Sequence, residues 1–169
     1  MKKALIHSIN STLEQAIFLL DIIDVDVYNQ TSVGPYYSSI GSHIRHILDF
    51  FDCIKSGLDD SIIDLTARKR DVRIAVDPEA AHQGIRSIQH TLTSYIGTNT
   101  DYLLHVTDDM GHGKVTVNYT LESILAHANS HALHHYAIIG YIMNSMGITY
   151  EIPGFGYNPS TPISKRSGI

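Results

Sequence analysis

The sequence predicts an all-α protein, a four-helix bundle in a single domain over residues 1–169. Four segments place apolar side chains three or four residues apart, which is the spacing of a buried helix face. Capping residues and glycine stops bound most of these segments. A chain of 169 residues with 43% hydrophobic content can form one sizeable core. Because each apolar stripe must be buried against the others, a bundle is the natural architecture.

The first predicted helix covers Ile9 to Val25, with Asn10 or Ser11 available as its cap. Apolar side chains recur through it at helical spacing. The stretch from Tyr28 to Tyr37 contains Asn, Gln, Ser, Gly and Pro, a composition typical of loops. We therefore expect a loop between the first and second helices.

The second predicted helix begins after Ser38 or Ser39, either of which can cap it, and runs to about Ser56. Gly57 provides the stop. The buried stripe of this helix is expected to consist of Ile40, Ile44, Ile47, Phe51 and Ile54.

A long crossover, residues 58–76, is expected between the second and third helices because its pattern is weak and charged. Residues 70–76 alternate enough for a short strand or an extended segment. Asp77 is a good cap and Pro78 suits the first helical position. The third helix is therefore expected from this point to about Tyr95.

The pattern then changes period, and the sequence indicates a small β-hairpin before the last helix. Residues 102–106 and 114–119 are rich in Leu, Val and Thr and are joined by a turn that contains two glycines. The fourth helix is expected from Thr120 to about Met146, and Gly147 provides its stop.

The last segment, residues 151–169, contains three prolines and several glycines, so we expect an irregular tail. Phe155 and Tyr157 suggest that part of it packs on the bundle. No internal repeat or second domain is indicated.

Composition narrows the function classes. Twelve basic against seventeen acidic residues give a net charge of -5, which argues against a nucleic-acid partner. The apolar runs are too short to span a membrane, and the first residues lack the apolar stretch of a signal peptide. Cys53, the one cysteine, fits a reducing compartment. These features predict a soluble, cytoplasmic protein.

Histidines provide the strongest functional signal. His131 and His135 are four residues apart near the centre of the apolar face of the fourth helix, so both rings can reach one point. His127 and His134 lie on the flank of that face. A third ring could come from the second helix, where His43 lies about 50° and His46 about 110° from the middle of the stripe.

Three neutral imidazoles suit zinc, nickel, iron or copper, and a three-ligand site leaves positions open for water or substrate. A buried histidine pair without metal must instead find hydrogen-bond partners for its ring nitrogens. The sequence therefore predicts a three-histidine metal site. Angle favours His43 as the third ligand, whereas a position at the seam between two helices suits His46.

Two segments resemble the DinB/YfiT-like superfamily of metalloproteins, which are four-helix bundles with a long crossover between helices two and three. The segments are Ser39-Ile40-Gly41-Ser42-His43-Ile44-Arg45-His46-Ile47-Leu48-Asp49 and Ser130-His131-Ala132-Leu133-His134-His135-Tyr136-Ala137-Ile138-Ile139. The family pattern has one histidine near the start of the second helix and a His-x-x-x-His pair in the fourth. The resemblance implies metal ligands at His46, His131 and His135, with His43 as the rival of His46.

The resemblance also implies a bound divalent ion, commonly zinc or nickel, and often a homodimer. Characterised branches include mycothiol-dependent maleylpyruvate isomerase and bacillithiol transferases, in which the metal activates a thiol. We therefore expect a metal-dependent transferase that uses a low-molecular-weight thiol. Two alternatives stay open: a non-catalytic bundle that binds a metal or small molecule, and a metal-dependent hydrolase, which would need a nearby general base.

Three further features have a functional and a structural interpretation. Asp49 could orient His46 or accept a proton, but an exposed helix carboxylate is the simpler expectation, so we do not include it in the site. Cys53 could be a fourth ligand or reactive thiol, although a lone helix cysteine is usually core filling. The Arg68-Lys69-Arg70 run could meet an anionic thiol or substrate, although such runs usually form a solvated face.

Overall fold

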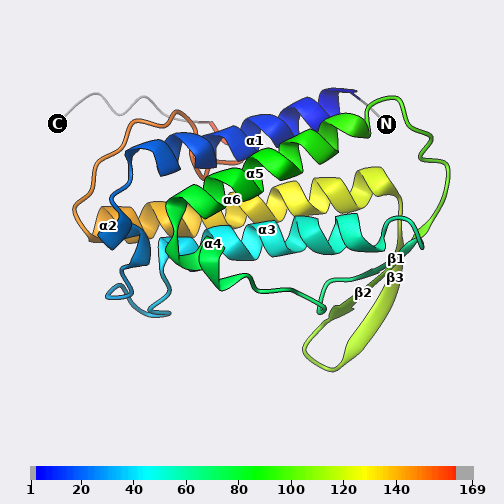
Figure 1. Ribbon diagram of the computed structural model, residues 1–169, viewed down its shortest axis with the longest axis horizontal. Helices are drawn as coiled ribbons and strands as arrows, with labels where there is room; N and C mark the ends of the chain where they lie inside the picture. The colour runs from blue at the N-terminus through cyan, green and yellow to red at the C-terminus, as the bar shows by residue number, and fades with distance from the viewer. Residues whose placement is uncertain (1–2, 163–169) are drawn as a thin grey trace.

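The computed structural model describes residues 3–162, and within that range the chain forms six helices and three strands. Four long helices run along the long axis of the molecule, with the strands at one end and two short helices at the other (Figure 1). In chain order, the elements are α1 (Lys3–Ile22), α2 (Val25–Asn29), α3 (Ile40–Gly57), β1 (Ile62–Asp64), α4 (Val72–Val76), α5 (Pro78–Ser94), β2 (Leu104–Asp109), β3 (Lys114–Tyr119) and α6 (Leu121–Ser145).

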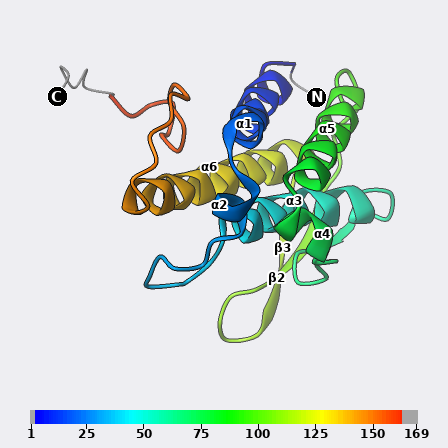
Figure 2. The same ribbon diagram turned by 60° about the vertical axis from the view of Figure 1, so that its left-hand side comes forward.

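The expectation of an all-α fold is wrong, because the chain contains a three-stranded mixed sheet in the order β1-β2-β3. The β2–β3 pair is the antiparallel hairpin that the sequence predicts, and Figure 2 shows it projecting away from the helices. β1 lies in the crossover and pairs parallel to β2, with Ile63 opposite Val106. Both of these side chains are buried. A three-residue strand is too short to reveal its alternation in sequence, which explains the missed element.

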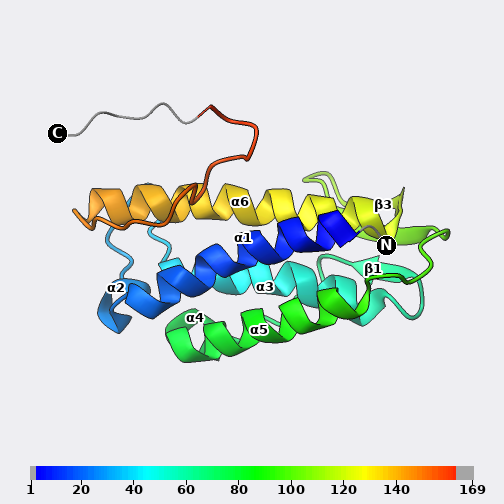
Figure 3. The ribbon, with the colours of Figure 1, turned by 90° about the horizontal axis from the view of Figure 1, so that it is seen from above.

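The four long helices enclose the main core. α3 packs against α5 and α6, and α1 packs against the same two helices (Figure 3). The predicted stripe of α3 is confirmed, since all five of its members are buried: Ile40, Ile44, Ile47, Phe51 and Ile54. This packing holds α3 beside α6 along much of its length and so determines which side chains of the two helices meet.

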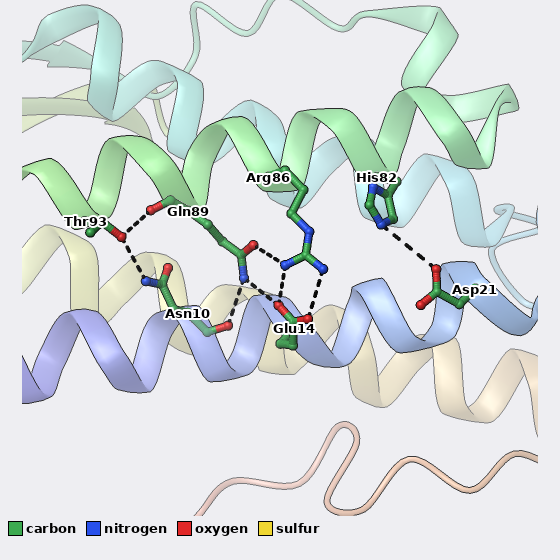
Figure 4. Close-up of polar contacts among 7 residues, drawn as sticks. All are labelled: Asn10, Glu14, Asp21, His82, Arg86, Gln89 and Thr93. Atoms are coloured by element: carbon green, nitrogen blue, oxygen red, sulfur yellow. Dashed lines mark hydrogen bonds and ion pairs between the residues drawn. The ribbon is translucent and has the colours of Figure 1, made fainter.

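Polar contacts add to the apolar packing between α1 and α5 (Figure 4). Both guanidinium nitrogens of Arg86 donate to Glu14, at 2.7 and 3.0 Å. Gln89 donates to the same carboxylate and to the Asn10 carbonyl. The hydrogen bond from Arg86 holds the pKa of Glu14 below its usual value. This network lies largely on the surface, so it contributes little to stability compared with the apolar packing.

Two predicted caps are confirmed, and a third cap is Thr120, which was expected only as the start of the fourth helix. Ser39 accepts from the Ser42 amide at the start of α3, and Asp77 accepts from the Glu79 amide at the start of α5. Thr120 and Ser123 bond reciprocally at the start of α6, which forms a capping box. These caps begin the helices where the sequence predicts, because a short polar side chain before an apolar run satisfies the free amides of the first turn.

The predicted bounds of the first helix are wrong. α1 begins at Lys3, well before Ile9, and it ends at Ile22. Ser11 lies inside the helix, where its hydroxyl donates to the carbonyl four residues back. Asp24 starts the separate helix α2 by accepting from the Asp26 amide. The cap at Asp24 therefore divides into two helices a segment whose apolar pattern predicts one.

The strand or extended segment expected over residues 70–76 is also wrong, because residues 72–76 form α4. Asp71 caps this helix by accepting from the Arg73 amide at 3.0 Å. The buried hydroxyl of Tyr28 donates to the Ile74 carbonyl at 2.7 Å. A segment of five residues is too short for its pattern to distinguish one helical turn from a short strand, and the tertiary contacts decide between them.

Part of the tail packs on the helices, as expected. Phe155 is buried and stacks on Tyr136 of α6, whereas Tyr157 is largely exposed. Residues 151–162 form no helix or strand, and the remaining predicted tail, residues 163–169, lies outside the described residues. None of the helices described is long and apolar enough to cross a membrane.

Candidate metal centre

Three histidines from two helices meet between α3 and α6. His46 of α3 and His131 and His135 of α6 each offer one nitrogen, and these three atoms lie within 4.8 Å of one another. The ring centroids are 4.6 to 4.8 Å apart. The three residues that the sequence resemblance implies as ligands therefore lie together.

Helix periodicity and helix packing together produce this cluster. The four-residue spacing stacks His131 and His135 on one face of α6. α3 and α6 run in opposite directions, so His43 meets His135 near one end while Phe50 meets His127 further along. His46 lies between those two contacts and faces both ligand candidates of α6.

His43 lies beside the cluster and contacts the ring of His135. Its Nδ1 is 2.8 Å from Nδ1 of His135, and its Nε2 is 2.7 Å from the Ser38 hydroxyl. If His135 uses Nε2 as a ligand, its Nδ1 carries a proton and donates to His43, which in turn donates to Ser38. This grouping favours His46 over His43 as the ligand from α3, and ligation itself stays a prediction.

The rings are held in their neutral form. Burial first, and then the neighbouring histidines, lower the pKa of His43 and that of His131 to about 4. The pKa of His135 falls far below its usual value, by burial first and then by His131, His46 and His43. Burial and then the charge of Arg68 lower the pKa of His46. Neutral rings keep a lone pair for a ligand even in mildly acidic solution.

The donor set fits a divalent ion of intermediate softness such as zinc or nickel. Among residues 3–162, no group forms a hydrogen bond to the buried Nε2 of His131, so this atom has an unsatisfied lone pair or proton. Zinc–nitrogen bonds are about 2.0–2.1 Å long. The rings therefore stand slightly farther apart than around a bound ion, and small side-chain rotations would close the site.

Asp49 differs from the sequence expectation of an exposed carboxylate, because it is buried. Its Oδ2 accepts from Arg45 at 2.9 Å, and its Oδ1 accepts from the backbone amide of Arg70 at 3.0 Å. Asp49 thus ties the crossover to α3 and does not contact the histidine cluster. An apolar stripe indicates which side chains face the core but carries no information on a partner from a distant loop.

Arg68 is the residue at this site whose role the sequence left open. It is half-buried, and its Nη1 lies 3.2 Å from Nδ1 of His46, while its Nε donates to the Leu65 carbonyl at 2.9 Å. Lys69 and Arg70 are exposed, as the solvated-face interpretation expects. The basic run therefore divides, and only its first member turns toward the histidines.

The other candidate residues lie outside the cluster. His127 and His134 are exposed, in agreement with their flank positions on α6. Cys53 is buried and faces a separate pocket of about 200 Å³ that Asp52, Asp64 and Lys69 also line. Burial raises the pKa of its thiol. Cys53 is therefore more consistent with a residue that fills space in the core than with a fourth metal ligand.

A second pocket adjoins the site on the C-terminal side of His135 in α6. Its volume is about 330 Å³, and Ser38 forms part of its wall together with Tyr36, Ile138 and Tyr141. Because Ser38 also bonds His43, this mostly apolar pocket lies next to the histidine chain. It has room for the apolar part of a small substrate.

Comparison with known proteins adds no assignment. No family model, curated protein or solved structure matches this chain. The class of protein is thus defined by its own features: a helical protein with an attached mixed sheet and a cluster of three neutral histidines between two helices.

Proposed function

We propose that the protein is a metal-dependent enzyme of the DinB/YfiT-like superfamily that transfers a small thiol to an electrophilic substrate. The observation that carries this proposal is the meeting of His46, His131 and His135, whose ligand atoms lie within 4.8 Å of one another. A divalent ion held there would stabilise a thiolate, the nucleophilic form of a thiol, near neutral pH.

The protein's own residues have distinct roles in this proposal. His46, His131 and His135 present neutral nitrogens, because burial keeps them unprotonated. His43 and Ser38 orient His135 through the two hydrogen bonds of their chain. In the reaction, the sulfur forms a bond to the electrophilic carbon, the leaving group departs with the electron pair of its former bond, and the thiol proton passes to solvent.

The hydrogen bonds of Asp49 favour thiol transfer over hydrolysis, because they engage the carboxylate away from the histidine cluster. A hydrolase would need a general base beside a bound water. Asp49, the candidate for that role, is engaged by Arg45 and Arg70 and does not contact the cluster. A non-catalytic metal-binding protein would use the same histidines. An assay of thiol transfer distinguishes it from an enzyme.

The first experiment is elemental analysis of untagged protein after incubation with zinc or nickel. We expect about one equivalent of metal, lost in His46→Ala, His131→Ala and His135→Ala. His43→Ala should keep the metal with weaker affinity, since it removes an orienting hydrogen bond and no ligand. His127→Ala, on the exposed flank of the same helix, is the matched control and should bind like the natural protein.

Activity is then assayed as the transfer of a small thiol, such as cysteine, to 1-chloro-2,4-dinitrobenzene, with release of chloride. The rate should depend on metal and fall to the uncatalysed level in His135→Ala. A protein that binds no metal would contradict the whole proposal. A metal-loaded protein with no thiol transfer would leave the non-catalytic alternative.

A further inference from the structure

Arg68 is held at the edge of the histidine cluster by two contacts. Its Nε donates to the Leu65 carbonyl and its Nη1 reaches Nδ1 of His46. The backbone amide of Arg70, two residues on, donates to the buried Asp49 and so secures the segment on α3. The guanidinium is therefore positioned by the fold, and it is only partly open to solvent.

The contact with His46 is incompatible with metal binding by that ring. A guanidinium only donates, so Nδ1 of His46 accepts, and in the neutral ring the proton is on Nε2. A metal on Nδ1 would displace Arg68 directly. A metal on Nε2 would move the proton to Nδ1, which could then accept nothing. In both cases Nη1 of Arg68 loses its acceptor when His46 becomes a ligand.

A half-buried guanidinium whose Nη1 has lost its acceptor is costly. The charges of Arg45 and Arg70 act on His46 as well, and Asp49 is already engaged by both of these residues. Three neutral rings also leave the charge of a divalent ion uncompensated. An anionic ligand would satisfy both the guanidinium and the excess positive charge.

We propose that Arg68 binds a carboxylate of the small molecule that occupies the open position of the metal site, and that in metal-free protein it competes with the metal for His46. This inference rests on the proposed function and narrows its substrate class to a thiol that carries a carboxylate. Metal and anion then bind cooperatively, because the metal frees the donor that the anion uses.

Affinity for cobalt(II) alone tests the competition, by titration against a chromophoric chelator. Arg68→Ala should bind cobalt about threefold to tenfold more tightly than the natural protein, since the competing hydrogen bond and a nearby positive charge are removed. Arg68→Met, which keeps an apolar side chain over the site, should do the same. Arg73→Ala removes an equal charge at an exposed position and should leave the affinity unchanged.

Two small thiols test recognition of the carboxylate on cobalt-loaded protein. Mercaptoacetate and 2-mercaptoethanol both supply a thiol, but only the first carries a carboxylate, and thiolate-to-cobalt absorption reports the binding of each. The natural protein and Arg73→Ala should prefer mercaptoacetate. Arg68→Ala and Arg68→Met should reduce that preference about tenfold or more while binding 2-mercaptoethanol as before, which also checks that they are folded.

The outcomes separate this inference from the function on which it rests. Unchanged cobalt affinity together with an unchanged thiol preference in both Arg68 variants would overturn the role of Arg68. If cobalt binds but neither thiol does, thiol transfer fails, and a titration with oxalate still tests the arginine: equal affinity in natural and variant proteins would count against it. Failure of the natural protein to bind cobalt would overturn both proposals.

Discussion

The histidines between α3 and α6 couple the stability of the metal-free protein to pH. His43 and His131 have pKa values of about 4 in the folded protein, compared with about 6.5 for a solvated histidine. The unfolded chain therefore binds more protons between these two values. The stability that neutral burial permits is fully present above about pH 6.5 and is lost as the pH falls toward 4.

We therefore predict that the free energy of unfolding of metal-free protein falls between pH 7 and pH 4.5, by at most about 1.4 kcal/mol per pH unit for each such histidine. Urea denaturation at a series of pH values measures this slope. His131→Gln should make the slope shallower. The exposed His112→Gln should not, and identical slopes for all three proteins would contradict the assignment.

At the scale of elements, the position of α3 depends on a close approach that only glycine allows. A Cβ on Gly41, in the first turn of α3, would overlap the Ala75 carbonyl oxygen of α4 and the ring of Tyr28. The backbone oxygen cannot move without displacing α4. Gly84 in α5 has a more forgiving neighbour, since its Cβ would meet only the flexible ends of Leu48 and Ile74.

Gly41→Ala should therefore lower the free energy of unfolding by about 1–3 kcal/mol, the usual range for overpacking. Gly84→Ala should change it much less, because the helix propensity of alanine, about 1 kcal/mol better than glycine, offsets the adjustment of the two side chains. Denaturant unfolding of both variants checks the contrast. Equal destabilisation by the two substitutions would mean that the α3–α4 contact is not the constraint.

The sheet connects the crossover between α3 and α5 to the hairpin that precedes α6. β1, from the crossover, pairs with β2, and Lys114 at the start of β3 donates to Asp64 at 3.1 Å. That ion pair is exposed and contributes little by itself. The buried pair Ile63 and Val106 contributes more, because it joins the crossover to the apolar interior. The same crossover carries Arg68, so the sheet helps to locate that arginine beside α3.

For the whole molecule, a metal in the histidine cluster would join α3 to α6 and so stabilise the folded state. Zinc at about 100 times its dissociation constant should raise the free energy of unfolding by about 2.7 kcal/mol, since the unfolded chain does not hold the three rings together. Denaturation with zinc and with a chelator measures the difference. His135→Ala should abolish it and the exposed His134→Ala should keep it, whereas an effect that survives His135→Ala would place the metal elsewhere.

Local features of the sequence determined most of the helices and two of the three histidines of the candidate site. Ser39, Asp77 and Thr120 mark helix starts because a cap acts within three residues of its own position. The α3 stripe and the pairing of His131 with His135 follow from helix periodicity alone. The hairpin was also predictable, because its two strands and turn are contiguous in the chain. The expected homodimer stays a prediction.

Contacts between distant segments were decided only by the tertiary structure. Strand β1 exists because β2, some forty residues later, supplies its partner, which is why the all-α expectation failed. The burial of Asp49 and the contact of Arg68 with His46 likewise depend on how the crossover lies on α3. Periodicity specifies the direction of a side chain about its own helix axis, whereas the group that it meets depends on the packing of the whole chain.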